Sequence, residues 1–185
     1  MRRILVLGGA VVVFLLMLQA FMLHLFGQPA ICPCGTVKWW EGLTSHSSLD
    51  ITDWYTFSHV IHGFIFYMAL RYIFPRLSFV QRLVIAVAIE AGWEIAENLP
   101  AVIEHYRQQA LSAQYTGDSI LNSVSDTIAM MIGFLFASRA PVWATIFTAL
   151  GFEIFIGYSI RDNLTLNVLG FFYQFDAIST WQRGS

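Results

Sequence analysis

Five apolar stretches, each about as long as a membrane-spanning helix, alternate with polar segments along the chain. They cover residues 4–26, 56–74, 79–98, 118–137 and 142–160. A helix needs about 20 predominantly apolar residues to cross the hydrocarbon core of a bilayer. The first stretch exceeds the roughly 7–15 apolar residues of a secretory signal, so we expect it to remain as a helix. The pattern predicts an all-α integral membrane bundle with about five transmembrane helices, in which residues 1–185 form one domain.

The distribution of arginines predicts how these helices are oriented. Arginines precede the first stretch and surround the short turn between the second and the third, at positions 2, 3, 71, 76 and 82. Cytoplasmic loops carry an excess of Lys and Arg. We therefore expect the N-terminus and this turn on the cytoplasmic side and the C-terminus on the external side. The apolar residues 168–175 are too few to span a bilayer and predict an interfacial or re-entrant C-terminal segment.

Carboxylates interrupt three of the apolar stretches, two of them more than once, and each costs roughly 2.5–3.5 kcal/mol on insertion scales unless it is compensated. Glu90, Glu94 and Glu97 are spaced by four and three residues and therefore share one helix face. A second polar stripe, spaced by four residues, begins the next stretch with Asp118, Asn122 and Asp126. Because lipid cannot solvate these groups, the two stripes are expected to face each other.

Other ionisable groups fall at the same membrane depth. His59 and His62 begin the second stretch on one helix face, and Glu153 lies in the outer half of the fifth. The inner halves of the last four stretches contain essentially no ionisable group. This sorting predicts a single polar cavity that opens to the external face.

A mixed set of histidines and carboxylates in one cavity suits a divalent ion such as zinc, manganese or iron. The expected ligands are His59, His62, Glu94, Glu97, Asp118 and Asp126. Glu90 or Glu153 would act as the general base toward a water molecule that the metal activates. Asn98, Ser119 and Asn122 would orient the ligands. The leading hypothesis is a metal-dependent hydrolase or transferase that acts on a lipid-linked or periplasmic small molecule.

The same residues allow other interpretations. Buried polar side chains also join membrane helices through hydrogen bonds, at about 0.6 kcal/mol each. Carboxylates can form a proton relay or take up cations, which would make the protein a non-enzymatic carrier or binding protein. A third alternative is an assembly factor without chemistry. These alternatives predict different results. The metal-dependent enzyme should contain a metal, and the carrier or binding protein should bind a ligand without turnover. In the assembly factor, substitutions of these residues should only weaken helix packing.

Cys32 and Cys34 form a second candidate site, separated only by a proline. A disulfide within so short a segment is expected to be strained, so the spacing predicts two thiols that could bind copper or zinc or exchange disulfides. The composition, with 57% hydrophobic residues and a net charge of −2, is typical of a membrane protein, whose main partner is the lipid bilayer. It offers no basic face for nucleic acid.

Several motifs together resemble a bacterial family of multi-pass inner-membrane proteins, domain of unknown function 2585. The motifs are His59-x-x-His62-Gly63, Glu90-x-x-Trp93-Glu94-x-x-Glu97-Asn98, Gly117-Asp118-Ser119-x-x-Asn122-Ser123-x-x-Asp126 and Arg161-Asp162-Asn163-x-x-x-Asn167. The likeness runs from the Cys-Pro-Cys-Gly segment to Trp181-Gln182. It implies a location in the bacterial cell membrane and assigns no activity. The order of the motifs is more loosely similar to VanZ-like membrane families, from which no residue role is carried over.

Overall fold

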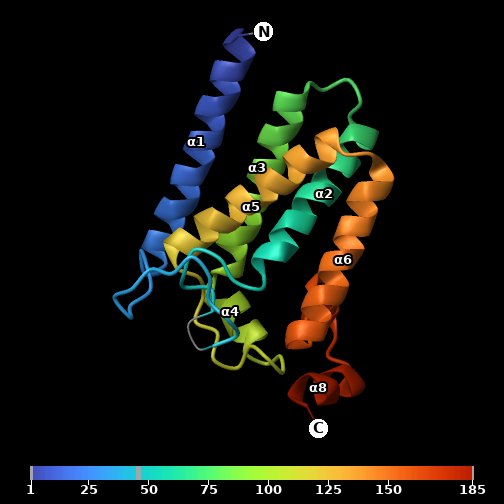
Figure 1. Cartoon of the computed structure of the whole chain (residues 1–185). Coiled ribbons are helices and arrows are strands. Elements are labelled where there is room, and N and C mark those ends of the chain that lie inside the picture. The colour runs from blue at the N-terminus through green and yellow to red at the C-terminus, as the bar shows by residue number, and fades with distance from the viewer. Residues whose placement is uncertain (1, 45–46, 185) are drawn as a thin grey trace.

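The computed structural model describes residues 2–44 and 47–184, which form five long helices and three short ones (Figure 1). The long helices are α1 (Arg2–Leu25), α2 (Thr56–Ile73), α3 (Phe79–Glu97), α5 (Ile120–Arg139) and α6 (Val142–Ile160). The short helices are α4 (Pro100–Tyr106), α7 (Leu164–Phe172) and α8 (Asp176–Arg183). The described residues contain no strand, and the all-α fold is confirmed. The long helices begin and end within two residues of the predicted stretches.

Local sequence explains where several helices begin. Ser78 caps α3 through a capping box, in which its hydroxyl accepts from the Gln81 backbone N–H and the Gln81 side chain accepts in return. Ser119 caps α5 by accepting from the Asn122 backbone N–H at 3.0 Å. Pro141 precedes α6, where the extended backbone that proline favours suits an N-cap. The Ser78 and Ser119 caps therefore fix the residues at which α3 and α5 begin.

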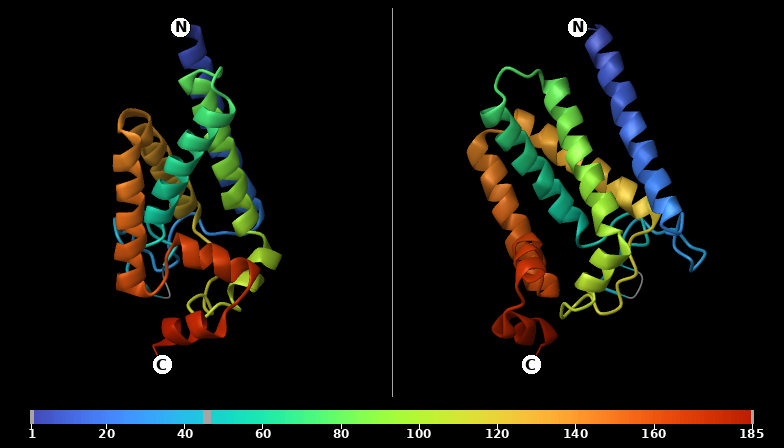
Figure 2. Two further views of the ribbon diagram at one scale, coloured as in Figure 1. Left: turned by 90° about the vertical axis from the view of Figure 1, so that its right-hand side faces the viewer. Right: turned by 180° about the vertical axis from the view of Figure 1, so that it is seen from behind.

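Helix α1 packs against both α3 and α5, and α3 also contacts α5 and α2. Helix α2 packs mainly against α5 and also contacts α6. The N-terminus and the C-terminus lie at opposite ends of the bundle (Figure 1). One end has only the short turns between α2 and α3 and between α5 and α6. At the other end, the segment before α2, helix α4, the segment before α5 and helices α7 and α8 gather together (Figure 2).

Helices α2 and α5 cross at two facing glycines. A Cβ added to Gly63 would lie 2.1 Å from the Met130 backbone oxygen, and one added to Gly133 would lie 2.1 Å from the Val60 backbone oxygen. Small residues at a crossing let the backbones of two membrane helices approach closely. This contact holds the histidine face of α2 against the polar stripe of α5.

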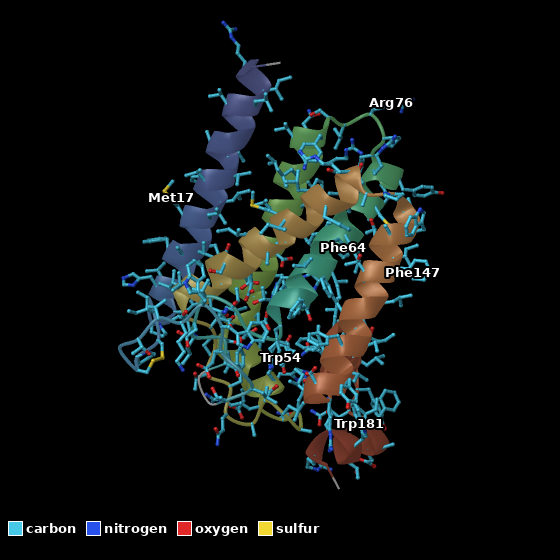
Figure 3. All side chains as sticks on the ribbon, viewed as in Figure 1. Met17, Trp54, Phe64, Arg76, Phe147 and Trp181 are labelled. Carbon is cyan, nitrogen blue, oxygen red and sulfur yellow. A yellow bond between two sulfur atoms is a disulfide. The ribbon has the colours of Figure 1, made fainter. Side chains whose placement is uncertain are left out.

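The interior divides into an apolar half and a polar half along the bundle. The apolar core lies toward the end with the short turns and includes Val12, Leu70, Val87, Met130 and Phe134. In Figure 3, side-chain oxygen atoms gather in the opposite half, below Phe64 and around Trp54. The predicted sorting of ionisable groups therefore holds for α2, α3 and α5, with one exception. Arg82, expected beside the turn, is 9% exposed in α3, with its guanidinium 5.9 Å from the Tyr67 ring centre.

The outer faces of α1 and α6 are apolar over most of their length. Exposed side chains there include Leu5, Phe14 and Met17 on α1 and Phe147 and Ile154 on α6. Soluble proteins rarely expose apolar surfaces of this size, so these faces indicate association with a membrane. Among the described residues, three helices are long and apolar enough to cross one: 3–25, 120–139 and 142–160. The predicted number of about five is not confirmed, because histidines and carboxylates make α2 and α3 more polar.

Candidate functional site

A cavity of about 720 Å³ occupies the polar half of the bundle. One wall consists of α2 and α3, and the opposite wall consists of α7, while the segments before α2 and before α5 close its end. Residues from all predicted polar stripes line it: His59, His62, Glu90, Glu97, Asp118 and Asp126. The cavity therefore brings together groups from helices that the sequence places far apart.

Two histidines of α2 share one carboxylate of α3. The Nδ1 atom of His59 lies 2.7 Å from Oε1 of Glu90, and Nδ1 of His62 lies 3.1 Å from Oε2. His59 and Glu90 are buried, whereas His62 is partly exposed to the cavity. One ligand atom from each residue can be chosen so that all three lie within 4.8 Å of one another. This group, called the His–Glu group below, places Glu90 among the candidate ligands, although we expected it to act as a general base.

Two further carboxylates surround His59. Oε1 of Glu94 lies 3.3 Å from Nδ1 of His59, and Oδ2 of Asp126 lies 3.8 Å from its Nε2. Thr56 donates a hydrogen bond to Oδ1 of Asp126 at 2.9 Å. Asp126 therefore lies near the ring nitrogen that points away from Glu90, at a distance too long for a direct hydrogen bond. Glu94, which we expected to be a ligand, does not line the cavity.

A buried chain of hydrogen bonds connects Glu94 to α1. Ser123 donates to Oε2 of Glu94 at 2.8 Å, and the Gln19 amide donates to Ser123 at 2.7 Å. Thr127 donates to the Gln19 side-chain oxygen at 2.9 Å. Gln19 is fully buried, and the sequence analysis missed it. The available signal was a single amide within the otherwise apolar first stretch.

Asp118 is fixed in position by Asn98. The Asn98 amide donates to Oδ2 of Asp118 at 2.7 Å, and the Asp118 backbone N–H donates to the Asn98 side-chain oxygen at 2.8 Å. Tyr115 donates to the other Asp118 oxygen at 3.0 Å. Asn98 therefore contacts a predicted ligand, as its expected orienting role requires. Glu97 and Asp118 both line the cavity beside the His–Glu group.

Ser119 and Asn122 bind backbone groups instead of ligands. Ser119 caps α5, and its backbone N–H donates to the Ser48 carbonyl at 2.9 Å. The Asn122 amide donates to the Asp50 carbonyl at 3.0 Å. Both residues are buried behind the cavity wall and tie the segment before α2 to the start of α5. They position that segment, which forms part of the closed end of the cavity.

Glu153 lies outside the cavity, contrary to the expectation that it shares the site. Its carboxylate oxygens accept hydrogen bonds from the backbone N–H groups of Leu164 and Thr165, at 3.0 and 3.1 Å. These N–H groups belong to the first turn of α7, where helix N–H groups have no partner within the helix. Glu153 therefore stabilises the start of α7, and a general-base role has no support from its position.

Cys32 and Cys34 form a disulfide, contrary to the expectation of two thiols. Their Cα atoms are 5.1 Å apart, within the usual range for a disulfide, so the local turn brings the sulfur atoms together despite the short spacing. Cys32 is buried, and neither cysteine lines the cavity. In this oxidised form the pair offers no thiolate to a metal.

Helices α4 and α7 brace each other on the outer side of the cavity. His105 of α4 donates through Nε2 to the Phe171 carbonyl at 2.7 Å, and the Tyr106 hydroxyl donates to the Asn167 side chain at 3.5 Å. Figure 2 shows α7, in orange-red, extending toward α4. The predicted interfacial C-terminal segment is thus a helix that forms a cavity wall.

Burial changes the proton affinity of groups at the closed end. Burial raises the pKa of Tyr115 well above its usual value, and the charge of Asp118 raises it further. Burial, followed by the charge of Glu97, likewise raises the pKa of Tyr106. Burial also raises the pKa of Asp53, which accepts backbone hydrogen bonds from Tyr55 and Ser48. The two tyrosines therefore remain hydroxyl donors at neutral pH.

Comparison with known proteins supports the motif resemblance. The family described as "Protein of unknown function (DUF2585)" matches residues 23–184. A UPF0314 protein of Sphingopyxis alaskensis is 49% identical over 179 residues, which cover 96% of this chain and 95% of the relative. UPF0314 proteins of Rhizobium etli and Paracoccus denitrificans are 51% and 50% identical, covering 93% and 90% of this chain and 89% and 88% of their own. No solved structure matches the chain. The chain belongs to the DUF2585 family.

Proposed function

We propose that this protein is a metal-dependent hydrolase or transferase of the bacterial inner membrane. His59, His62 and Glu90 would bind the metal, and a lipid-linked or periplasmic small molecule would occupy the cavity. The observation that carries the proposal is the His–Glu group itself, in which three ligand atoms lie within 4.8 Å of one another on the cavity wall. A cluster that only joined helices would have no need to face a cavity of about 720 Å³.

The residues present fit a divalent transition metal. Two imidazoles and one carboxylate make up the protein ligands of several catalytic zinc sites, which leave a further position open for water or substrate. Ligand atoms about 2.1 Å from a tetrahedral ion lie roughly 3.4 Å from one another, and the three candidate ligand atoms lie within 4.8 Å of one another. The Glu90 oxygens now form hydrogen bonds of 2.7–3.2 Å with the two imidazoles, so the side chains would move apart slightly to admit an ion. In addition, Oε1 of Glu94 is buried without a hydrogen-bond partner and faces His59.

A bound divalent ion supplies Lewis-acid chemistry and lowers the pKa of water. The residues around it would supply the remaining functions. Glu97 and Asp118 line the cavity and are the candidates for proton transfer, while Asp126, 3.8 Å from Nε2 of His59, would act on that imidazole through its charge. Tyr115 keeps Asp118 in place through its hydrogen bond. The apolar wall would exclude water from the reacting groups.

Metal analysis of the purified protein tests this proposal. After growth in metal-replete medium, we expect about one equivalent of zinc, manganese or iron per chain by elemental mass spectrometry. The His62→Ala variant removes one ligand and should weaken metal binding by more than about 100-fold, because loss of an orienting partner alone costs 10–100-fold.

His24→Ala is the matched control, since this imidazole is exposed on α1 and lies outside the cavity lining. It should bind as much metal as the unaltered protein. Less than about 0.2 equivalents of any transition metal in the unaltered protein would overturn the proposal. A tightly bound structural or catalytic ion stays with the protein during purification, so close to one equivalent should remain. Metal binding without turnover of any amphiphile would instead support a binding protein.

The proposed orientation places all five long helices across the membrane, with the N-terminus in the cytoplasm. Arg71, Arg76 and Arg139 lie at the end of the bundle with the short turns, as expected for the cytoplasmic side. The termini lie at opposite ends (Figure 1), as an odd number of spans requires. The cavity would then face the periplasm.

Reporter fusions test this orientation. Alkaline phosphatase, which is active only in the periplasm, should be active when fused to the C-terminus and inactive when fused after Arg76. Green fluorescent protein at the same two positions should give the reverse pattern. Equal activity of the phosphatase at both positions would contradict the proposed number of spans.

A further inference from the structure

The cavity combines an apolar wall with an acidic floor. Aromatic and aliphatic side chains from three helices form the wall, among them Phe66, Ile89, Trp93, Val168 and Phe171. The floor contains Glu97, Asp118 and Asp126 in addition to the His–Glu group. Such a division matches a ligand that has a hydrocarbon part and a polar part.

The charge of the floor restricts which polar part can bind. None of the described residues that line the cavity is a lysine or an arginine. A divalent ion on the His–Glu group would still leave more carboxylates than positive charges around it. Phosphate groups are bound by Arg, Lys, helix N-termini or metal ions. Only an ion on the His–Glu group could hold a phosphate here, and the surrounding carboxylates would repel it. A ligand that carries a positive charge is therefore complementary, and a phosphate-bearing one is not.

Aromatic rings lie beside the acidic groups. Tyr55, Tyr106 and Tyr115 line the closed end of the cavity, and Trp93 lines its wall. Aromatic faces attract cations within about 6 Å, and proteins recognise ammonium ligands in this way. Carboxylates and aromatic faces together favour an amine or ammonium group over a neutral hydroxyl.

The apolar wall continues to the surface along α7. Phe172 lines the cavity and is 82% exposed, and Val168 and Leu169 of the same helix are also exposed. A hydrocarbon chain that follows this wall would reach the membrane interface, where α7 is proposed to lie.

From these features we infer that the substrate is an amphiphile with a long hydrocarbon chain and a positively charged amine at its polar end, without a phosphate group. This inference rests on the proposed function, because that function makes the cavity the substrate site. The amine would lie against Glu97 and Asp118, and the chain would lie between Trp93 and α7. The neighbouring His–Glu group would then face the bond that joins the amine-bearing part to the rest of the substrate.

Binding of brominated amphiphiles to the full-length protein tests the inference. The protein is placed in phosphatidylcholine nanodiscs at pH 7.5 and titrated with dibromostearylamine, dibromostearyl alcohol or dibromostearic acid. Bromine quenches nearby tryptophan fluorescence, and the difference from a Trp93→Phe variant isolates the cavity tryptophan. We expect the amine to bind about tenfold more tightly than the alcohol, and the acid to bind more weakly than either.

Charge variants provide the controls. Glu97→Gln should abolish most of the preference for the amine, and Asp118→Asn, which keeps an oxygen acceptor for Tyr115, should do the same. Glu104→Gln is the matched control, because Glu104 is 67% exposed, pairs with Arg107 and lies outside the cavity lining. It should keep the full preference.

Equal or tighter binding of the acid, or quenching of Trp93 that is the same for all three probes, would overturn the inference. So would an unchanged amine preference in both Glu97→Gln and Asp118→Asn. Metal content is measured on the same preparation. Amine preference without metal would overturn the metal-dependent function but keep the ligand class, whereas metal without amine preference would do the opposite.

Discussion

Replacing His59 with leucine is expected to lower the free energy of unfolding by about 3 kcal/mol. The imidazole lies within 4 Å of Glu90, Glu94 and Asp126, and its loss leaves these buried carboxylates without their shared partner. Removing one member of a buried ion pair is strongly destabilising because the other charge stays buried. Thermal unfolding of the detergent-purified protein should show a midpoint about 10 °C lower.

His24→Leu is the control for the His59 variant, because it makes the same change on the exposed face of α1. Its midpoint should stay close to that of the unaltered protein, since surface substitutions usually change stability by less than about 0.5 kcal/mol. Both variants are compared with and without a chelator, which separates the effect of the charges from that of a bound metal. A His59→Leu midpoint equal to that of His24→Leu would show that the cluster is not coupled to folding.

The Gly63→Ala variant is expected to lose about 3 kcal/mol of stability, a large effect for a single methyl group. The new Cβ would lie 2.1 Å from the Met130 oxygen and 2.5 Å from the Phe134 nitrogen. Both are backbone atoms of α5, so the whole helix would have to move. Because α2 carries both histidines, the displacement should also weaken metal binding, which titration with zinc would measure.

Gly151→Ala is a control in which the free energy of unfolding should stay the same or rise. Gly151 lies in α6 with no atom within 4 Å of an added Cβ, and alanine is more favourable than glycine in a helix by about 1 kcal/mol. This variant should be as stable as the unaltered protein or slightly more stable. Gly133→Ala should resemble Gly63→Ala, and the double variant should cost less than the sum, because both methyl groups disturb the same contact. Two harmless single variants would contradict the close crossing.

The long helices were predictable from the sequence because each coincides with a mostly apolar stretch of about 20 residues between polar or turn-forming segments. The meeting of α2, α3 and α5 was predictable for a related reason. His59, Glu90 and Asp126 cannot face lipid at acceptable cost, so they had to face one another. The helix spacing placed Glu90, Glu97, Asp118 and Asp126 correctly on the cavity, whereas Glu94 and Asn122 do not line it.

The choice of ligands among these groups was not predictable. Glu90 and Glu94 share a helix face, but one turn separates them by about 6 Å along the axis. Only the tilt and depth of α3 against α2 decide that Glu90 meets both histidines while Glu94 turns toward Ser123. Residues on α1 matter here too, and the apolar pattern of that helix gives no sign that Gln19 faces inward.

The partners of Glu153 could not be predicted from the sequence for a different reason. Arg161 adopts a left-handed backbone conformation, with φ of 58°, which ends α6 and turns the chain back on itself. The N-terminus of α7 then lies beside Glu153 and takes its carboxylate. No spacing rule predicts such a reversal, because the partners are backbone N–H groups whose position depends on the turn. The Cys32–Cys34 disulfide likewise depends on local backbone geometry.

The hydrogen bond between Gln19 and Ser123 has a consequence for biosynthesis. Its two residues are 104 positions apart in the chain. At 5–20 residues per second, the amide on the first helix leaves the ribosome roughly 5–20 s before its hydroxyl partners exist. During that interval the Gln19 amide lacks both of its hydroxyl partners and must form hydrogen bonds elsewhere. Helix α1 can therefore reach its final packing only after α5 has been made.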